Sequence, residues 1–396
     1  DIKGNEISIY RMKLRHTVYL GFIIRFAVLI FILTLGHHIS KPYFIADDIK
    51  YEIVAKVYMN NADMLFDSYY LKVIEETYIA PFWPWVAGIS AYIFKTIYAS
   101  RFLNIIFSTI SIRIIYNLTC EVSGEEKSAL RAARFFAYLP VTVMTCCFPI
   151  KDIFLTMSVM YAFYMFMRLK NGKRLKIFQV LLTILLLVCV YYTRGAVVEL
   201  MIIFLLVVIL FKYARQKRYV SLFFWFLAAI VIFMLLRNMI MTSFETKMDD
   251  YGGGSAAESG IAFVQINSAK DMYKLPATVF FANLQPITLN FFSVGKATYW
   301  HRIMSHLNVS IYPIAIGNTA YIFMKKKDLF FWLSTFIMYS AVVILSTGVF
   351  RHYLFLLPVQ IINYSVITVE KPEYGNRFLN LSVLFFALIG IYSILQ

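Results

Sequence analysis

The sequence has few charged residues and few cysteines. Charged side chains make up 15% of the 396 residues, and the four cysteines are Cys120, Cys146, Cys147 and Cys189. The adjacent pair cannot easily bridge to itself, and no spacing typical of a cysteine metal site occurs. These features argue against a disulfide framework and a cysteine-ligated metal centre, and we interpret the cysteines as small core residues.

The common motifs of nucleotide-binding and hydrolytic enzymes are also absent. No GxGxxG, Walker A, HExxH or GxSxG motif stands in the structural context that its mechanism requires. The alternating ten-residue pattern of an outer-membrane barrel is missing, and no internal repeat stands out. Candidate functional residues must therefore be found from where charges fall along the chain.

Hydrophobic residues, in contrast, are abundant. They make up 60% of the chain, and the mean hydropathy is +0.69. Apolar runs of about 18 to 20 residues recur, each long enough to cross a membrane as a helix. The sequence predicts an all-α, polytopic transmembrane helix bundle of about 11 to 13 helices. The predicted spans are 17–36, 101–119, 132–149, 152–169, 177–193, 196–213, 219–237, 305–324, 328–347, 352–370 and 377–395.

The positive charges predict the topology. The net charge is +16, and Lys and Arg cluster between apolar runs at 168–176, 212–218 and 325–327. This is typical of cytoplasmic loops beside anionic lipid, so we expect no nucleic-acid partner and a cytoplasmic amino terminus. With these clusters inside, 81–98 is expected on the outer surface as an interfacial or re-entrant helix, its "PFWPW" supplying interfacial tryptophans. Residues 276–296 are then a partial crossing.

We therefore expect residues 1–396 to form a single transmembrane domain with two external loops. The first loop, 37–100, carries interfacial helices. The second, 238–275, contains "YGGGSAAESG" and is expected to be flexible. The expected location is a bacterial plasma membrane, with the functional site facing outside.

Six charged residues near the ends of apolar runs are all predicted to lie on the external face. They are Asp47 and Asp48, Lys151 and Asp152, Arg194, and Arg351. Adjacent aspartates beside lipid could act as a general base or bind a divalent cation such as Mg²⁺ or Mn²⁺. The alternative is a solvated loop, or Asp48 helping to start a helix.

The remaining external charges also allow two interpretations. Asp152 could join the aspartate pair in catalysis or metal binding while Lys151, Arg194 and Arg351 bind a phosphate. Alternatively, "PIKDIF" is a simple hairpin turn and the arginines extend to the membrane interface. Arg25 and Arg113 lie within predicted spans, where each needs a partner or a water-filled cavity.

Several stretches together resemble a known family. "ADDIKYEIVAKVY", "APFWPWVAGISAYIFKTIYASRFLNIIFSTISIRIIYNL" and "FFAYLPVTVMTCCFPIKDIF" follow the first span in the order seen in GT-C glycosyltransferases. The similarity covers roughly residues 15–200 and is to bacterial lipid-carrier enzymes related to protein mannosyltransferases and aminoarabinose transferases. "FRHYLFLLPVQIINY" is similar to a late Arg-Tyr-Leu-Pro element of such chains.

The resemblance implies a membrane glycosyltransferase of cell-surface glycan assembly. Its donor would be a polyprenyl-phosphate sugar, and its acceptor a glycan, lipid or protein reached from outside. Asp47 or Asp48 would be the catalytic carboxylate and Asp152 its acidic partner. The sequence departs from the pattern at Lys151, which precedes Asp152.

Two other functions stay open. "YYTRGAVVELMIIFLLVVIL" looks like the Ser-Arg-Gly step of capsule or O-antigen polymerases and ligases, which act on polyprenyl-pyrophosphate glycans through arginines. A lipid-linked sugar transporter or flippase would be favoured by an inverted repeat and broken helices, of which "NLQP" in 276–296 is the one hint.

Overall fold

The computed structural model describes residues 2–35, 46–60, 82–231, 234, 273–274, 300, 303, 307–324, 335 and 354–395. These residues contain helices and no strand, which confirms the predicted all-α class for this part of the chain. Five of its helices are long enough and apolar enough to cross a membrane. The predicted loop 238–275, apart from residues 273–274, and the ambiguous segment 276–296 lie outside the described ranges.

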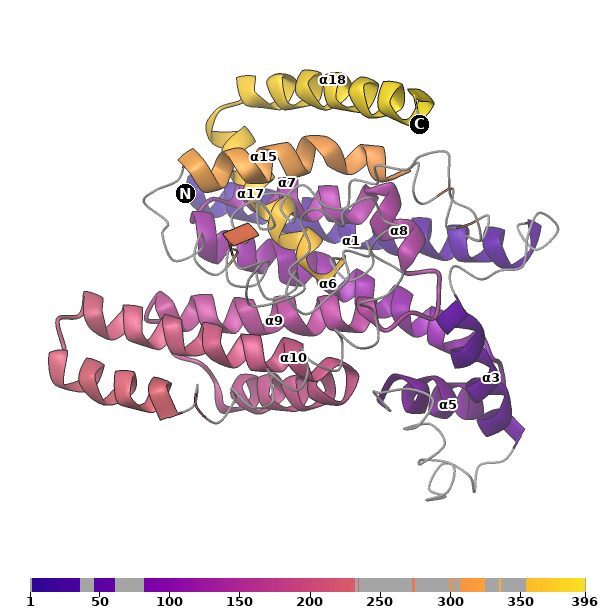
Figure 1. Ribbon diagram of the computed structural model, residues 1–396, viewed down its shortest axis with the longest axis horizontal. Helices are drawn as coiled ribbons and strands as arrows, with labels where there is room; N and C mark the ends of the chain where they lie inside the picture. Colours follow the sequence, from indigo (N-terminus) through magenta and orange to yellow (C-terminus); the bar gives the residue numbers. More distant parts are fainter. Residues whose placement is uncertain are drawn as a thin grey trace.

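Three long helices form the centre of the molecule (Figure 1). They are α1 (Ile2–Leu33), α6 (Ala99–Ser123) and α9 (Asp152–Lys170). α6 packs against both α1 and α9. Gly124 ends α6 with a φ of 70°, a left-handed conformation that glycine adopts without strain. α9 has an acidic residue in its first turn and Arg168 and Lys170 in its last turn, which suits the helix dipole.

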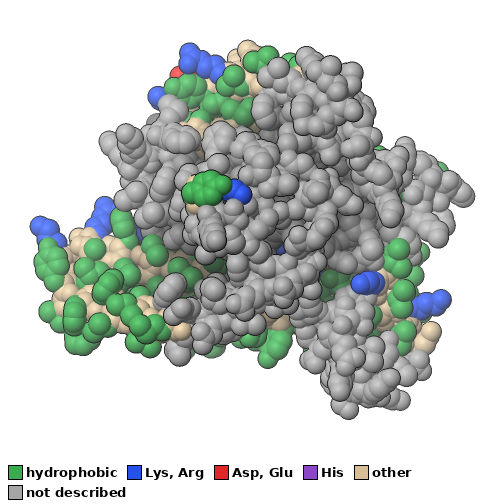
Figure 2. Space-filling model, in the orientation of Figure 1, with side chains coloured by type: hydrophobic (Ala, Val, Ile, Leu, Met, Phe, Trp, Pro, Cys, Tyr) green, Lys and Arg blue, Asp and Glu red, His purple; other side chains and the backbone are tan. Residues whose placement is uncertain are grey.

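Helix α10 (Ile177–Arg215) contains two candidate spans joined at a kink. The spans are Ile177–Gly195 and Val197–Arg215, close to the predicted 177–193 and 196–213. At the junction, Arg194 has non-helical backbone angles, φ −163° and ψ 84°. Hydrophobic side chains cover the surface of α10 and the following helix, with Lys and Arg at the far end (Figure 2). An apolar surface with basic ends is what a lipid-facing hairpin requires.

The predicted span 132–149 is not one continuous helix. The chain instead forms α7 (Glu126–Tyr138) and the short α8 (Pro140–Thr145). Leu139, between them, is extended, with φ −63° and ψ 123°. Proline disfavours the helical conformation in the residue before it, and its ring prevents the helix from continuing through. The expectation of an unbroken helix from apolar composition was therefore wrong here.

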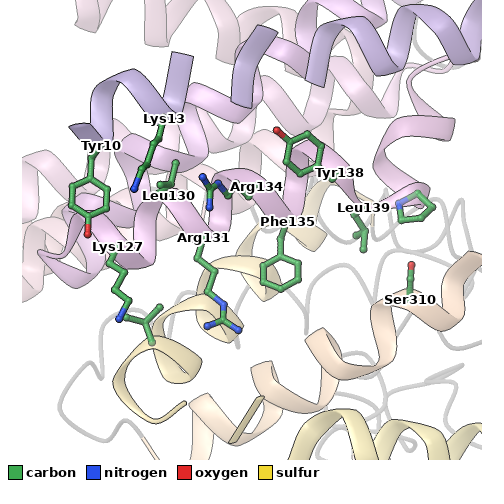
Figure 3. Close-up of a pocket in the computed structure, with 12 residues that line it drawn as sticks. Tyr10, Lys13, Lys127, Leu130, Arg131, Arg134, Phe135, Tyr138, Leu139 and Ser310 are labelled. Carbon is green, nitrogen blue, oxygen red and sulfur yellow. The ribbon is translucent and has the colours of Figure 1, made fainter. Parts of the chain in front are cut away.

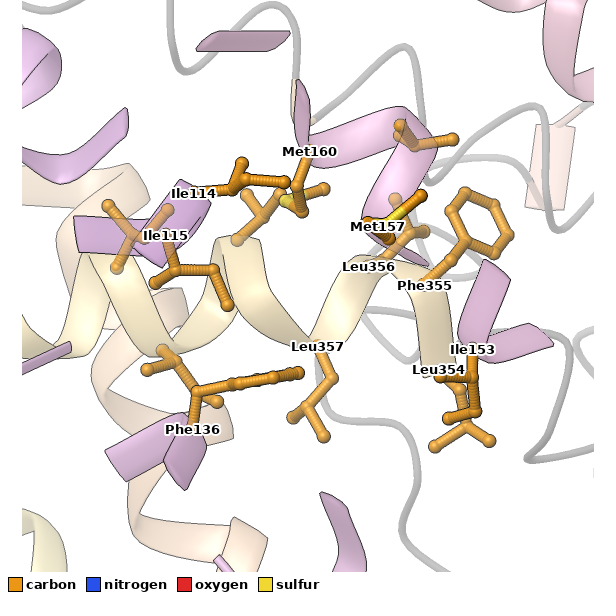
Figure 4. Close-up of a cluster of buried hydrophobic side chains, with 14 of the residues drawn as sticks. Ile114, Ile115, Phe136, Ile153, Met157, Met160, Leu354, Phe355, Leu356 and Leu357 are labelled. Carbon is orange, nitrogen blue, oxygen red and sulfur yellow. The ribbon is translucent and has the colours of Figure 1, made fainter. Parts of the chain in front are cut away.

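The buried core brings together segments that are far apart in the sequence. Figure 4 shows Ile114 and Ile115 of α6, Phe136 of α7 and Ile153 of α9 around residues 354–357. This late segment leads into α17 (Leu357–Glu370), which packs against α7. The 3-10 helix η4 (Asn308–Ile311), α15 (Tyr312–Met324) and α18 (Glu373–Leu395) complete the described part, and α15 packs on both α17 and α18.

Arg25, within the first span, has a structural role. Its side chain is fully buried, and it donates hydrogen bonds to the carbonyl oxygens of Phe136 (3.0 Å) and Ala137 (2.7 Å). Its Nε also donates to the Ser108 hydroxyl at 2.9 Å. The last carbonyls of a helix have no partner within that helix, so Arg25 satisfies the end of α7 and ties α1 to α6 and α7.

Two further helices lie together at one end of the bundle (Figure 1). They are α3 (Ala46–Asn60) and α5 (Phe82–Phe94), which pack closely on each other. A Cβ at Gly88 of α5 would lie 2.1 Å from Cδ2 of Tyr58, so this contact requires glycine. α5 has 13 residues, fewer than the roughly 20 that a helix needs to cross a bilayer, and the outer-surface position of 81–98 stays a prediction.

Candidate active site

Two of the predicted site residues meet at the end of the bundle near α3 and α5. Asp152 is the first residue of α9, and its side chain is 3% exposed. Arg194 lies at the kink of α10, and its Nη1 is 4.0 Å from Oδ1 of Asp152. This separation exceeds a hydrogen bond but is within range of strong electrostatic attraction. A carboxylate and a guanidinium from different helices are therefore paired at one site.

The segment that leads into Asp152 is held by hydrogen bonds from α5 and α6. Four successive carbonyl oxygens, those of residues 147–150, accept them. Arg101 Nη1 lies 3.4 Å from the first of these oxygens, and Asn104 Nδ2 donates to the second and fourth at 2.7 and 2.9 Å. Trp83 Nε1 donates to the third at 2.8 Å. Buried backbone oxygens need such partners, so this network fixes the entry to α9.

A buried ion pair connects the same network to α3. Arg101 donates from both Nε (2.7 Å) and Nη2 to Oε1 of Glu52. The two side chains are 0% and 4% exposed. Because Arg101 also reaches the segment before Asp152, α3 and the start of α9 are linked through one guanidinium. A buried ion pair can specify one arrangement of the elements that it joins.

Aromatic rings pack around the first turn of α9. The ring of Phe154 lies 5.3 Å from Phe82, 6.3 Å from Trp83 and 5.6 Å from Phe107, measured between centroids. These separations are in the range of favourable aromatic pairs. The packing and the hydrogen bonds together restrict how far Asp152 can move.

The other predicted site residues are described only in part. Asp47 and Asp48 lie in the first turn of α3, while their side chains fall outside the described residues. Lys151 is the half-buried residue immediately before α9. Arg351 is also outside the described residues, but Leu354, three positions later, shares the core cluster with Ile153 (Figure 4).

Several residues of this region were missed by the sequence interpretation. Arg101, Glu52 and Asn104 sit in ordinary helical stretches, and no spacing in the sequence marks them as partners. Trp83 was expected in an interfacial belt, but its side chain is fully buried and donates to the segment before Asp152. Its amphipathic indole fits either environment, so composition alone does not distinguish them.

Glu199 is a further buried carboxylate. It is 4% exposed, lies in the span Val197–Arg215, and its Oε2 has no hydrogen-bond partner among the described residues. An ionisable residue within a span is costly and usually functional. A lone carboxylate in an apolar run would have identified it: Glu199 stands in "RGAVVEL", five residues after Arg194.

The predicted divalent-cation site is not tested by this arrangement. Among the described side chains, no group of three or more His, Cys, Asp or Glu residues is placed to hold a metal ion. Two of the three predicted ligands, Asp47 and Asp48, are outside that set. The cation therefore stays a prediction.

Comparison with known proteins gives a distant structural likeness. No protein-family model and no curated protein sequence matches the chain. The archaeal oligosaccharyltransferase AglB from Archaeoglobus fulgidus, in complex with an inhibitory peptide and a dolichol-phosphate, is similar with 14% identity and a TM-score of 0.40. The match covers 80% of this chain and 46% of that one. The Archaeoglobus fulgidus oligosaccharyltransferase tethered to an acceptor peptide gives 14% identity, a TM-score of 0.38, and coverage of 79% and 46%.

The chain thus spans less than half the length of the oligosaccharyltransferases it matches. A likeness of this strength does not show the activity of this chain.

Proposed function

We propose that the protein is a membrane glycosyltransferase, of the hexosyl- or pentosyltransferase class, that acts in cell-surface glycan assembly. It transfers a sugar from a polyprenyl-phosphate-linked donor to a hydroxyl group of a glycan, lipid or protein on the external side of a bacterial plasma membrane. The pairing of Asp152 with Arg194 at one end of an apolar bundle carries this proposal. A lipid phosphate requires a cation at the membrane boundary, and an acceptor hydroxyl requires a carboxylate nearby.

In the proposed reaction, the acceptor oxygen attacks the anomeric carbon of the sugar. The bond from that carbon to the phosphate oxygen breaks, and its electron pair leaves with the lipid phosphate. Asp47 or Asp48 takes the proton of the acceptor hydroxyl, and Asp152 orients the acceptor and Arg194. Arg194, Arg351 and Lys151 neutralise the departing phosphate. The predicted Mg²⁺ or Mn²⁺ would be held by Asp47, Asp48 and Asp152.

The buried Glu52–Arg101 pair supports the inclusion of the first-loop aspartates. It fixes α3, whose first turn holds positions 47 and 48, to the segment before Asp152. Positions four apart share one face of a helix, and position 48 is four before Glu52. This spacing favours Asp48 over Asp47 as the residue nearer to Asp152.

Chain length supports the inclusion of Arg351. Leu354 belongs to the same buried cluster as Ile153, the residue after Asp152. Three residues of extended chain reach at most about 11 Å. Arg351 stands three residues before Leu354 in the sequence, so the chain permits it to act at the same site.

The proposal is tested with the full chain in lipid nanodiscs and a panel of polyprenyl-phosphate-linked hexoses and pentoses. The measured quantity is polyprenyl phosphate released with sugar, lipid and peptide acceptors present. Asp152→Asn and Arg194→Ala are each expected to lower turnover by on the order of 10² or more. Lys173→Gln, at the opposite end of α9, is the control and should be unchanged. Release from no donor, or equal release in all variants, would overturn the proposal.

A second function is favoured by the position of Arg194 at a helix kink. A polymerase or ligase acting on polyprenyl-pyrophosphate glycans would depend on arginines and little on the aspartate pair. Asp47→Asn and Asp48→Asn would then leave activity nearly unchanged while Arg194→Ala abolished it. Movement of lipid-linked sugar across vesicles without release of polyprenyl phosphate would instead indicate a transporter or flippase.

A further inference from the structure

A basic pocket lies between α1, α7, η4 and α17, away from the candidate active site. Its volume is about 770 Å³. Four cations line it, Lys13 of α1 and Lys127, Arg131 and Arg134 of α7. No Asp or Glu is among its described lining residues. The pocket therefore has a strongly positive lining.

The spacing along α7 explains how these cations meet. Lys127, Arg131, Arg134 and Tyr138 follow one another at intervals of four, three and four residues, so they share one face of the helix. The adjoining face, with Leu130 among its residues, packs into the core. α7 is thus an amphipathic helix whose basic stripe lines an open pocket, with Lys127 and Arg134 exposed and Arg131 half-buried.

The carboxylates close to this stripe in sequence have other contacts. Glu125 accepts a hydrogen bond from Ser128 at 2.8 Å, and Glu126 lies 3.9 Å from the thiol of Cys120. Across the described part of the chain, neither Lys127 nor Arg134 forms an ion pair. The positive charge of the pocket is therefore not neutralised by these neighbours.

The pocket is also apolar along part of its length. Figure 3 shows the basic side chains gathered at the end nearer the start of α7, with Phe135 and Leu139 further along the helix. A charged end that continues into an apolar cleft between helices matches an amphiphile with an anionic head group. A free anion would use only the charged end.

The position of the pocket fits this ligand. α7 begins close to the carboxyl ends of α6 and α9, which are tied together by Asn171 and Lys173 of the turn after α9 contacting Glu121. That end is opposite Asp152, and the charge pattern predicts that it faces the cytoplasm. Basic pockets between helices at a cytoplasmic membrane surface are suited to anionic lipid head groups.

We propose that this pocket binds an anionic phospholipid, with the head-group phosphate among Lys13, Lys127, Arg131 and Arg134 and the chains along Phe135 and Leu139. The site is separate from the proposed glycosyl-transfer centre and does not depend on it. Its ligand would be a component of the surrounding membrane and not the donor consumed in the reaction.

The test is native mass spectrometry of the full chain in detergent, titrated with phosphatidylglycerol, phosphatidylcholine or inorganic phosphate. Phosphatidylglycerol is expected to bind saturably, and phosphatidylcholine at least about tenfold more weakly. The variant Lys127→Gln/Arg134→Gln should weaken phosphatidylglycerol binding about 25-fold, since each cation near an anionic membrane contributes about fivefold. Inorganic phosphate at millimolar concentration should not compete.

The matched control is Arg215→Gln/Lys217→Gln, which removes one Arg and one Lys from exposed positions at and just after the end of α10. It should change binding less than about twofold, because its cations lie outside the pocket. The charge-preserving Lys127→Arg/Arg134→Lys should bind within about threefold of the unaltered chain. If the double variant fails to fold, Arg134→Gln, at an exposed position, should still lose about fivefold.

Three results would overturn the proposal. Equal loss in the pocket and control variants would indicate general attraction to a basic surface. Equal affinity for the two phospholipids would show that the net charge of the head group does not determine binding. Competition by inorganic phosphate at the affinity of the lipid would assign the pocket to a free anion.

Discussion

The buried pair of Glu52 and Arg101 permits a quantitative prediction of stability. Arg101 is fully buried, so Arg101→Met leaves the Glu52 carboxylate, 4% exposed, without its counter-charge. Removing one partner of a buried pair costs about 3–5 kcal/mol. The carbonyl of Cys147 also loses its donor, at 3.4 Å, which adds about 1 kcal/mol. We expect Arg101→Met to lower the free energy of unfolding by about 4–6 kcal/mol.

The double variant Glu52→Gln/Arg101→Met is the informative comparison. Glu52→Gln alone leaves a buried guanidinium unpaired and is expected to cost about 3–5 kcal/mol. Together the two changes remove both charges, so the double variant should be more stable than Arg101→Met alone. The coupling should therefore greatly exceed the roughly 0.5 kcal/mol seen between independent sites. Denaturant titration in mixed detergent micelles measures all three free energies.

A matched exposed pair supplies the control. Lys173 is 55% exposed and contacts Glu121 at 2.9 Å, so Lys173→Met is expected to cost less than about 1 kcal/mol. If the two single losses simply add in the double variant of Glu52 and Arg101, those residues do not act as a buried pair. The link from α3 to the segment before Asp152 would then be refuted.

Three further predictions concern the same end of the bundle. Asn104→Leu leaves two buried carbonyl oxygens without hydrogen-bond donors and should lower the free energy of unfolding by about 2–6 kcal/mol. It should also lower turnover more than affinity for the sugar donor, and an unchanged melting temperature would contradict this prediction. Gly88→Ala places a Cβ 2.1 Å from Cδ2 of Tyr58 and should lower the free energy of unfolding, measured by thermal unfolding, by about 1–3 kcal/mol or more. A neutral effect would mean that α3 and α5 separate freely. In the polyprenyl-phosphate release assay, Asp48→Asn should lose on the order of 10² in rate and Asp47→Asn less; the reverse order would assign the base to Asp47.

Much of the helical framework was predictable, because crossing a bilayer requires long apolar runs that are visible in any window of sequence. The spans beginning near residues 101, 152, 177 and 196 all appear as helices close to their predicted bounds. The span 132–149 failed at Pro140, where a local backbone restriction overrides apolar composition. Pro140 is visible in the sequence, but mean hydropathy does not detect the backbone restriction that it imposes.

Charge by itself identified Asp152 and Arg194 as candidates, because an ionisable group at a membrane boundary is conspicuous in an apolar chain. Their pairing, 42 residues apart in sequence, required the packing of α10 against α9 and the kink at Arg194. Arg101, Asn104 and Trp83 were not predictable as positioning residues, since each works through backbone carbonyls, which every residue carries. The sequence thus determines which groups bear charge and where most of the long apolar helices lie. Only the tertiary structure decides which of those groups share a site, because hydrogen bonding and burial depend on segments that are distant along the chain.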